Sequence, residues 1–142
     1  MAGTHVNILV WRGGVGDDFK STRHAALFFI QDGNKKGGDM VHVSGTSRNF
    51  VFQIREGYQP ETSSNLAGRV HVALLPHTME ALRAKSQQVP INNAEDEWNC
   101  QHWVGEALQK FVGDGLITAE VRAKAVDEMV DIALQAIDDQ PF

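Results

Sequence analysis

Cys100, the single cysteine of this 142-residue chain, stands at a position that suits covalent chemistry. Asn99 is a good N-cap, and apolar residues recur after it at helical spacing until the Gly-Asp-Gly segment 113–115. Cys100 would then begin a helix, where free backbone N–H groups and the helix dipole favour a thiolate and predict a lowered thiol pKa. The same N–H groups can hold an oxyanion on a carbonyl that the sulfur attacks. The competing interpretation is a buried structural cysteine that packs as a small hydrophobe.

The general base for such a nucleophile is expected from a strand and not from the helix itself. His102 lies two positions after Cys100, and residues two apart on a helix point to different faces. A helix-surface imidazole is therefore the expected role of His102. Among the remaining histidines, His71 and His77 are alternative candidates for the base.

Two histidines begin or interrupt apolar runs that are typical of strands. His24 opens the run that ends at Ile30, and by alternation it faces the same side as Ala26 and Phe28. His42 lies between two valines and faces the opposite side from them. A neutral imidazole at position 42 can hold the second ring nitrogen of the base and so select its tautomer.

The elements that must position these residues are strands first and helices last. Short runs rich in Val, Phe and Ile, separated by turn formers, predict antiparallel strands at 6–11, 24–30, 40–43, 49–54 and 69–75. The glycines at 13–16 follow the first strand, but their spacing is not that of a phosphate-binding loop, and they predict a turn. Helices are expected at 78–85, from Asn99 to the Gly-Asp-Gly segment, and after Thr118. The fold class is therefore α+β, with an antiparallel sheet packed against the helix that carries Cys100.

The last helix is amphipathic, with acidic and amide side chains on one face and apolar side chains on the other. We expect it either to cap the domain or to contact a second copy of the chain in a homo-oligomer.

Composition limits the classes of protein and of partner. The length suits a single domain over 1–142, and 42% hydrophobic with 22% charged residues is ordinary globular composition. A formal net charge of −5 without a dense basic cluster disfavours nucleic-acid binding. The longest apolar run, 25–30, is too short for a transmembrane segment, and no signal pattern opens the chain, so a soluble cytoplasmic protein is expected. Scattered histidines and one cysteine predict no disulfide, metal site or cofactor.

Three segments together resemble a known family. They are His-Ala-Ala-Leu-Phe-Phe at 24–29, Val-His-Val at 41–43 and Asn-Cys-Gln-His-Trp-Val at 99–104. In type and order they resemble the His-Trp-Ala-Leu-Tyr-Val, Ile-His-Leu and Asn-Cys-Glu-His-Phe-Val motifs of the lecithin:retinol acyltransferase-like family, a permuted branch of the papain-like cysteine enzymes related to the NlpC-type peptidases. The resemblance covers roughly residues 24–112. It implies a permuted papain-like fold with Cys100 as nucleophile, His24 as general base and His42 as the orienting third member.

The activity that this resemblance implies is acyl transfer. Cys100 would attack an ester, thioester or amide of a small-molecule or acylated substrate, and the thioester would be released to water or another nucleophile. The acidic C-terminal segment differs from the apolar tail of membrane-active relatives, which argues against a membrane-lipid substrate. A cysteine peptidase or isopeptidase is one alternative. The other is a catalytically silent binding module that presents aromatic residues to a ligand, namely Phe50, Phe52, Tyr58, Trp98 and Trp103.

Overall fold

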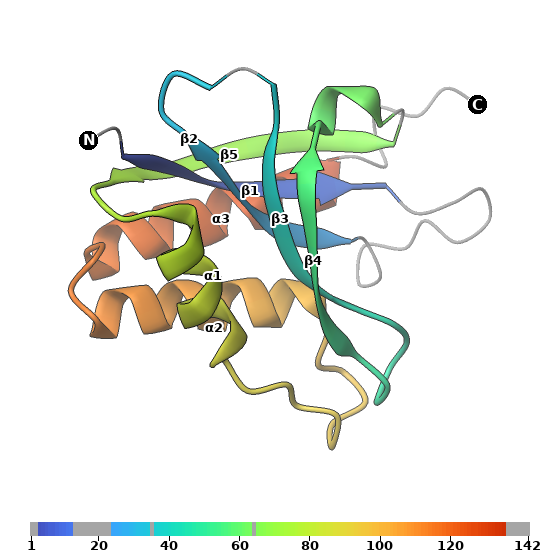
Figure 1. The fold of residues 1–142 in the computed structure, drawn as a ribbon. Helices are drawn as coiled ribbons and strands as arrows, with labels where there is room; N and C mark the ends of the chain where they lie inside the picture. Colours follow the sequence, from blue (N-terminus) through green and yellow to red (C-terminus); the bar gives the residue numbers. More distant parts are fainter. Residues whose placement is uncertain (1–2, 13–23, 35, 64, 136–142) are drawn as a thin grey trace.

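Five antiparallel strands form one sheet in the structure, a computed structural model that describes residues 3–12, 24–34, 36–63 and 65–135. The strands are β1 (Thr4–Trp11), β2 (Ala25–Gln31), β3 (Gly38–Ser44), β4 (Val51–Tyr58) and β5 (Leu66–Leu75). Their order across the sheet is β4-β3-β2-β1-β5, so β1 to β4 form a meander and β5 returns to pair with β1 (Figure 1). A single 3₁₀ turn, η1 (Pro60–Thr62), lies between β4 and β5.

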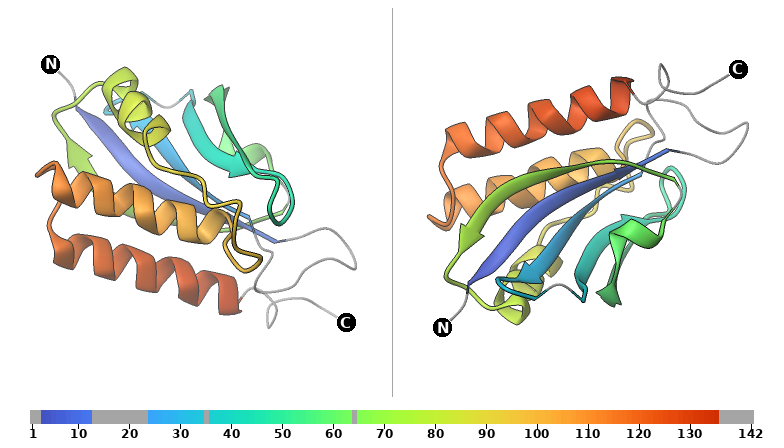
Figure 2. Two further views of the ribbon diagram at one scale, coloured as in Figure 1. Left: turned by 90° about the horizontal axis from the view of Figure 1, so that it is seen from below. Right: turned by 90° about the horizontal axis from the view of Figure 1, so that it is seen from above.

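Three helices follow the sheet in the chain: α1 (Met79–Gln87), α2 (Cys100–Gly113) and α3 (Ala119–Gln135). Figure 2 shows α2 and α3 running side by side along one face of the sheet. Helix α3 packs mainly on β5 and β1, whereas α2 packs on β2 and β3. None of the helices in the described ranges is both long enough and apolar enough to cross a bilayer.

Alternation along the strands divides the buried apolar residues between two clusters. The larger cluster lies between the sheet and the helices, where Ile8, Leu27 and Val41 meet Trp103 and Leu108 of α2. The smaller cluster, on the other face, contains Leu9, Trp11, Ala26, Phe28 and Met40. Helix α2 therefore packs against the inner face of the central strands.

The α+β class, the antiparallel sheet and the C-terminal helix are confirmed, and the differences lie at the ends of elements. β4 begins and ends later than predicted, and β5 begins at Leu66, before the predicted start at 69. His24 immediately precedes β2 and does not lie within it. The turn predicted for 13–16 lies outside the described residues.

An ion-pair network joins α1 to the far edge of the sheet. Arg83 of α1 donates to Asp39 of β3 at 2.8 Å and to Glu56 of β4 at 3.0 Å. The Asp39 side chain is buried, and burial raises the pKa of this carboxyl although Arg83 beside it acts in the opposite direction. This network fixes α1 across the outer strands.

Packing of α2 on the sheet sets the stability of the fold and the placement of Cys100. Leu108→Ala should lower the free energy of unfolding by about 2–5 kcal/mol, because Leu108 is fully buried between α2 and the sheet. Leu134→Ala in α3, where the side chain is 44% exposed, is the matched control and should cost less than about 1 kcal/mol. Urea unfolding followed by circular dichroism measures both values, and equal losses would contradict this account of the core.

Candidate functional site

Asn99 closes the N-terminus of α2 with a capping box. Its side-chain oxygen accepts hydrogen bonds from the backbone N–H groups of Gln101 at 2.9 Å and His102 at 3.4 Å. In return, the backbone N–H of Asn99 donates to Nδ1 of His102 at 3.2 Å. The prediction that Asn99 is the N-cap is confirmed, and His102 is an exposed capping residue. The side chain of Asn99 thus takes up two of the free backbone N–H groups at the start of α2. Fewer of these groups remain to bind an oxyanion than the sequence predicts.

Cys100 lies at the point where the start of α2 touches the start of β2. The backbone N–H of Ala25 donates to the Sγ atom of Cys100 at 3.4 Å, across 75 positions of sequence. The cysteine is 5% exposed and belongs to the core cluster between sheet and helices. The strand that begins one residue after His24 therefore holds the sulfur through its backbone.

Burial raises the pKa of the Cys100 thiol, and this overturns the expectation of a lowered value. The backbone N–H groups of Ala25, Cys100 and Gln101 favour the thiolate, but desolvation is the larger effect. The helix terminus therefore only reduces the penalty that burial imposes on a charged sulfur. In the resting protein Cys100 is a thiol.

His24 and His42 form a hydrogen-bonded pair. The Nε2 atom of His24 lies 2.6 Å from the Nδ1 atom of His42, and the rings meet edge to face. On its other side the His24 ring stacks against the indole of Trp11 at a centroid distance of 5.2 Å. The backbone N–H of Trp11 also donates to the His24 carbonyl oxygen at 2.9 Å. Trp11, which sequence reasoning missed, thus holds the first imidazole from the neighbouring strand.

Both imidazoles are held in their neutral form. Burial, followed by the neighbouring His42, lowers the pKa of His24 to about 4. Burial, followed by the positive charge of Arg55, lowers the pKa of His42 to about 4 as well. A neutral thiol and two neutral imidazoles therefore occupy this corner of the molecule at neutral pH.

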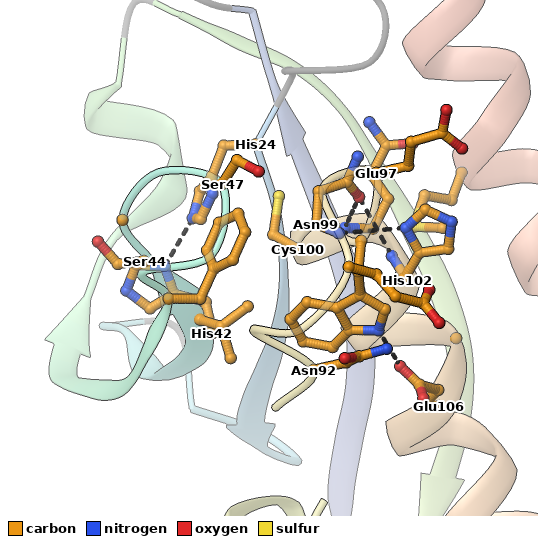
Figure 3. A pocket seen from close by; sticks show the side chains of 18 of the residues that line it. His24, His42, Ser44, Ser47, Asn92, Glu97, Asn99, Cys100, His102 and Glu106 are labelled. Carbon is orange, nitrogen blue, oxygen red and sulfur yellow. Dashed lines mark hydrogen bonds between the residues drawn. The ribbon is translucent and has the colours of Figure 1, made fainter. Parts of the chain in front are cut away.

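The three residues line one broad, open cavity of about 1480 Å³ (Figure 3). One wall comes from β3 and the loop after it, from Val43 to Ser47. A second wall comes from the segment before α2, and a third from the facing side of α3. Cys100, His24 and His42, which are far apart in sequence, thus share a solvent-connected space large enough for a small-molecule ligand.

The other residues singled out from the sequence are distributed differently. His71 lies on the outer face of the sheet, where its Nε2 atom is 2.9 Å from Nδ1 of His5, and neither His71 nor His77 is among the described residues that line the cavity. Phe52 and Trp103 pack together against the core. Tyr58 contacts Trp11 and Phe28 on the outer face.

Two aromatic residues do reach the cavity. Phe50 and Trp98 are both buried and both contribute to its wall, and their rings meet at 5.8 Å. The indole N–H of Trp98 donates to the Oε2 atom of Glu106 at 2.6 Å. Trp98, one of the aromatic residues that the sequence offered for contact with a ligand, thus lines the cavity, whereas its carboxylate partner had no signal in the local sequence.

Within the four described ranges, no group of three or more His, Cys, Asp or Glu side chains is arranged to bind a metal ion. A family model matches residues 16–118, and the chain belongs to that family, a family of unknown function (DUF6540). No curated protein and no solved structure matches the chain.

The neutral histidine pair predicts a loss of stability in mild acid. Between pH 6.5 and about 4 the unfolded chain binds protons at these imidazoles and the folded chain does not, so stability must fall as the pH falls. For His24 the loss is at most about 3 kcal/mol. Urea unfolding at pH 7, 5.5 and 4.5 should show this decline, and His24→Gln should flatten it. An equal decline in wild type and variant would contradict the assignment.

The buried thiol predicts slow alkylation. Iodoacetamide should modify Cys100 several-fold more slowly than free cysteine at pH 8, because little of the sulfur is ionised or exposed, and the rate should keep rising above the ordinary thiol pKa. The urea-unfolded chain is the control and should react at the rate of free cysteine. Rapid labelling below neutral pH would instead indicate that the helix terminus outweighs burial.

Proposed function

We propose that this protein is a cysteine-dependent acyl-transfer enzyme on a permuted papain-like fold, similar to the lecithin:retinol acyltransferase-like and NlpC-type enzymes. The observation that carries the proposal is the meeting of Cys100, His24 and His42 at one cavity, with the two imidazoles 2.6 Å apart. The order of the elements supports the resemblance, because His24 immediately precedes β2, His42 lies in the neighbouring β3, and α2, later in the chain, begins at Cys100.

The hydrogen bond between the imidazoles decides which nitrogen can act as base. If His24 donates from Nε2 to Nδ1 of His42, its own Nδ1 carries no proton and can accept one. The opposite arrangement would place the proton on Nδ1 of His24 and remove the base. His42 accordingly acts as a positioning residue that selects the reactive tautomer of His24.

The first half of the reaction forms a thioester. Nδ1 of His24 takes the proton of the Cys100 thiol while the sulfur attacks the carbonyl carbon of the substrate. The C–S bond forms, and the carbonyl π electrons move to oxygen. When the tetrahedral intermediate collapses, the bond to the leaving group breaks and His24 returns the proton to that group. Because both partners start neutral, proton transfer accompanies attack and no thiolate–imidazolium pair exists beforehand.

The second half of the reaction releases the acyl group. His24 takes a proton from water or another acceptor, whose oxygen or nitrogen attacks the thioester carbonyl. The C–S bond then breaks, and the sulfur regains the proton from His24. Whether the protein acts as a hydrolase, an acyltransferase or a peptidase depends on which acceptor and which acyl donor enter the cavity.

One observation favours a second candidate, a catalytically silent binding module on the same fold. The thiol is 5% exposed, and burial raises its pKa, both of which reduce its reactivity. Incubation with 4-nitrophenyl acetate followed by intact-mass measurement separates the two candidates. An acyl-transfer enzyme gains the mass of one acetyl group on Cys100 during turnover, whereas a binding module gains none.

Substitutions test the roles within the enzyme. Cys100→Ala should abolish the acyl adduct and the release of 4-nitrophenol, and His24→Ala should lower the rate by about 10²- to 10⁴-fold because the base is lost. His42→Ala should lower the rate less than His24→Ala does, because His42 only orients the base whereas His24 accepts the proton. His102→Ala is the matched control: it removes one capping hydrogen bond, costs about 1 kcal/mol of stability and leaves the rate nearly unchanged. A loss in His102→Ala equal to that in Cys100→Ala would contradict these assignments.

A further inference from the structure

The last residue of β1 lies against the residue that precedes β2. The backbone N–H of Trp11 donates to the His24 carbonyl oxygen at 2.9 Å, which extends the β1–β2 ladder by one hydrogen bond. The next residue, Arg12, donates its backbone N–H to the carbonyl oxygen of Asn65 at 2.8 Å. The main chain is therefore fixed at this corner of the sheet, and the freedom that His24 retains is rotation of its side chain.

The indole of Trp11 restricts this rotation. It lies over the His24 imidazole at a centroid distance of 5.2 Å, with an angle of 30° between the two ring planes. His42 meets the same imidazole edge to face, at 4.7 Å and 76°. A stacked indole on one side and a second ring edge to face leave few orientations open to the His24 ring. Among the described ring contacts of His24, only the one with His42 would remain without the indole.

Trp11 is itself held on the face of the sheet away from the helices. It is 7% exposed and belongs to the smaller apolar cluster on that face. Tyr58 of β4 meets the indole edge to face at 6.2 Å, and the guanidinium of Arg55 lies over the Tyr58 ring. Trp11 is not among the described residues that line the cavity. It therefore contacts His24 without forming part of the space in which a substrate would bind.

The orientation of the His24 ring decides whether His24 can act as the base. In the proposed reaction Nε2 of His24 donates to Nδ1 of His42, and Nδ1 of His24 accepts the proton of the thiol. Rotation of the ring breaks the 2.6 Å hydrogen bond and moves both nitrogens. Proton transfer requires donor and acceptor within hydrogen-bond reach. The rate therefore depends on the fraction of molecules in which the ring is correctly oriented.

We propose that Trp11 is a positioning residue of the acyl-transfer reaction: its indole holds the His24 imidazole in the orientation in which Nε2 donates to His42 and Nδ1 is available to the thiol. This inference rests on the proposed function, because it takes His24 as the general base. It adds a residue that lies outside the cavity, on the other face of the sheet. Trp11 changes the rate of the chemical steps and not the binding of the substrate.

Kinetics with 4-nitrophenyl acetate test this division. After subtraction of the Cys100→Ala rate, Trp11→Leu should lower kcat about tenfold and leave KM within about twofold of the wild-type value, because the indole orients the base and does not line the cavity. Trp11→Phe keeps an aromatic face for the imidazole and should retain kcat to within about threefold. An unchanged kcat in Trp11→Leu, equal losses in Trp11→Leu and Trp11→Phe, or a change in KM alone would overturn the inference while leaving the proposed function intact.

Phe28→Leu is the matched control. Phe28 is fully buried in the same cluster as Trp11, and within the described ranges it neither stacks on His24 nor lines the cavity. Both substitutions remove a buried ring and lower stability, so the assays are run where urea unfolding shows each variant to be folded. Where Trp11→Leu does not fold, Trp11→Met replaces it, since methionine fills irregular gaps in a core. Phe28→Leu should keep kcat within about twofold. A loss as large as that in Trp11→Leu would assign the effect to general loosening of this face and overturn the role of Trp11.

An NMR measurement separates failure of the inference from failure of the enzymatic proposal. The proton between Nε2 of His24 and Nδ1 of His42 should resonate far downfield of ordinary ring N–H protons, because the two nitrogens are 2.6 Å apart, and His42→Ala should remove this resonance. It should persist in Phe28→Leu and Trp11→Phe and broaden or vanish in Trp11→Leu, even where no ester is turned over. Its absence from the wild type, or its persistence in Trp11→Leu, overturns the inference whether or not Cys100 is acylated by 4-nitrophenyl acetate.

Discussion

The hydrogen bond from the backbone of Ala25 to the sulfur of Cys100 joins the two parts of the molecule on which the site depends. It connects the first residue of β2 to the first residue of α2, and the packing of α2 on β2 and β3 keeps them together. His24, one residue before β2, is brought to the same cavity by the same contact. The capped end of α2 forms part of the cavity wall. A shift of α2 along the sheet would therefore move the sulfur of Cys100 relative to both imidazoles and change the shape of the cavity.

Desolvation controls the protonation of this site more strongly than the helix terminus does. Three backbone N–H groups favour the thiolate of Cys100, yet burial raises its pKa above the ordinary value. The same burial lowers the pKa of His24 and of His42 to about 4. The proposed reaction starts from this neutral site, in which the sulfur stays protonated until the carbonyl group of a substrate is present. In the proposed mechanism this couples ionisation of the thiol to occupation of the cavity.

The wall of the cavity opposite the histidines is rich in carboxylates. Carboxylates from the segment before α2 and from α2 itself gather there, and Trp98 holds one of them through a short hydrogen bond. On the side of the histidines, the Nε2 atom of His42 is buried and has no hydrogen-bond partner among the described residues.

Local patterns in the sequence determined the antiparallel strands, the three helices and the N-cap at Asn99, because each depends on residue type and spacing within a few positions. They also determined the faces of β3, with the valines at 41 and 43 toward the helices and Met40 on the far side. Only the tertiary structure decided the stacking of Trp11 on His24, the bond between Trp98 and Glu106, and the direction of the Cys100 pKa shift. The first two depend on which side chains packing brings together. The third depends on how completely water is excluded, and burial arises from the whole fold, not from the helix start at which Cys100 lies.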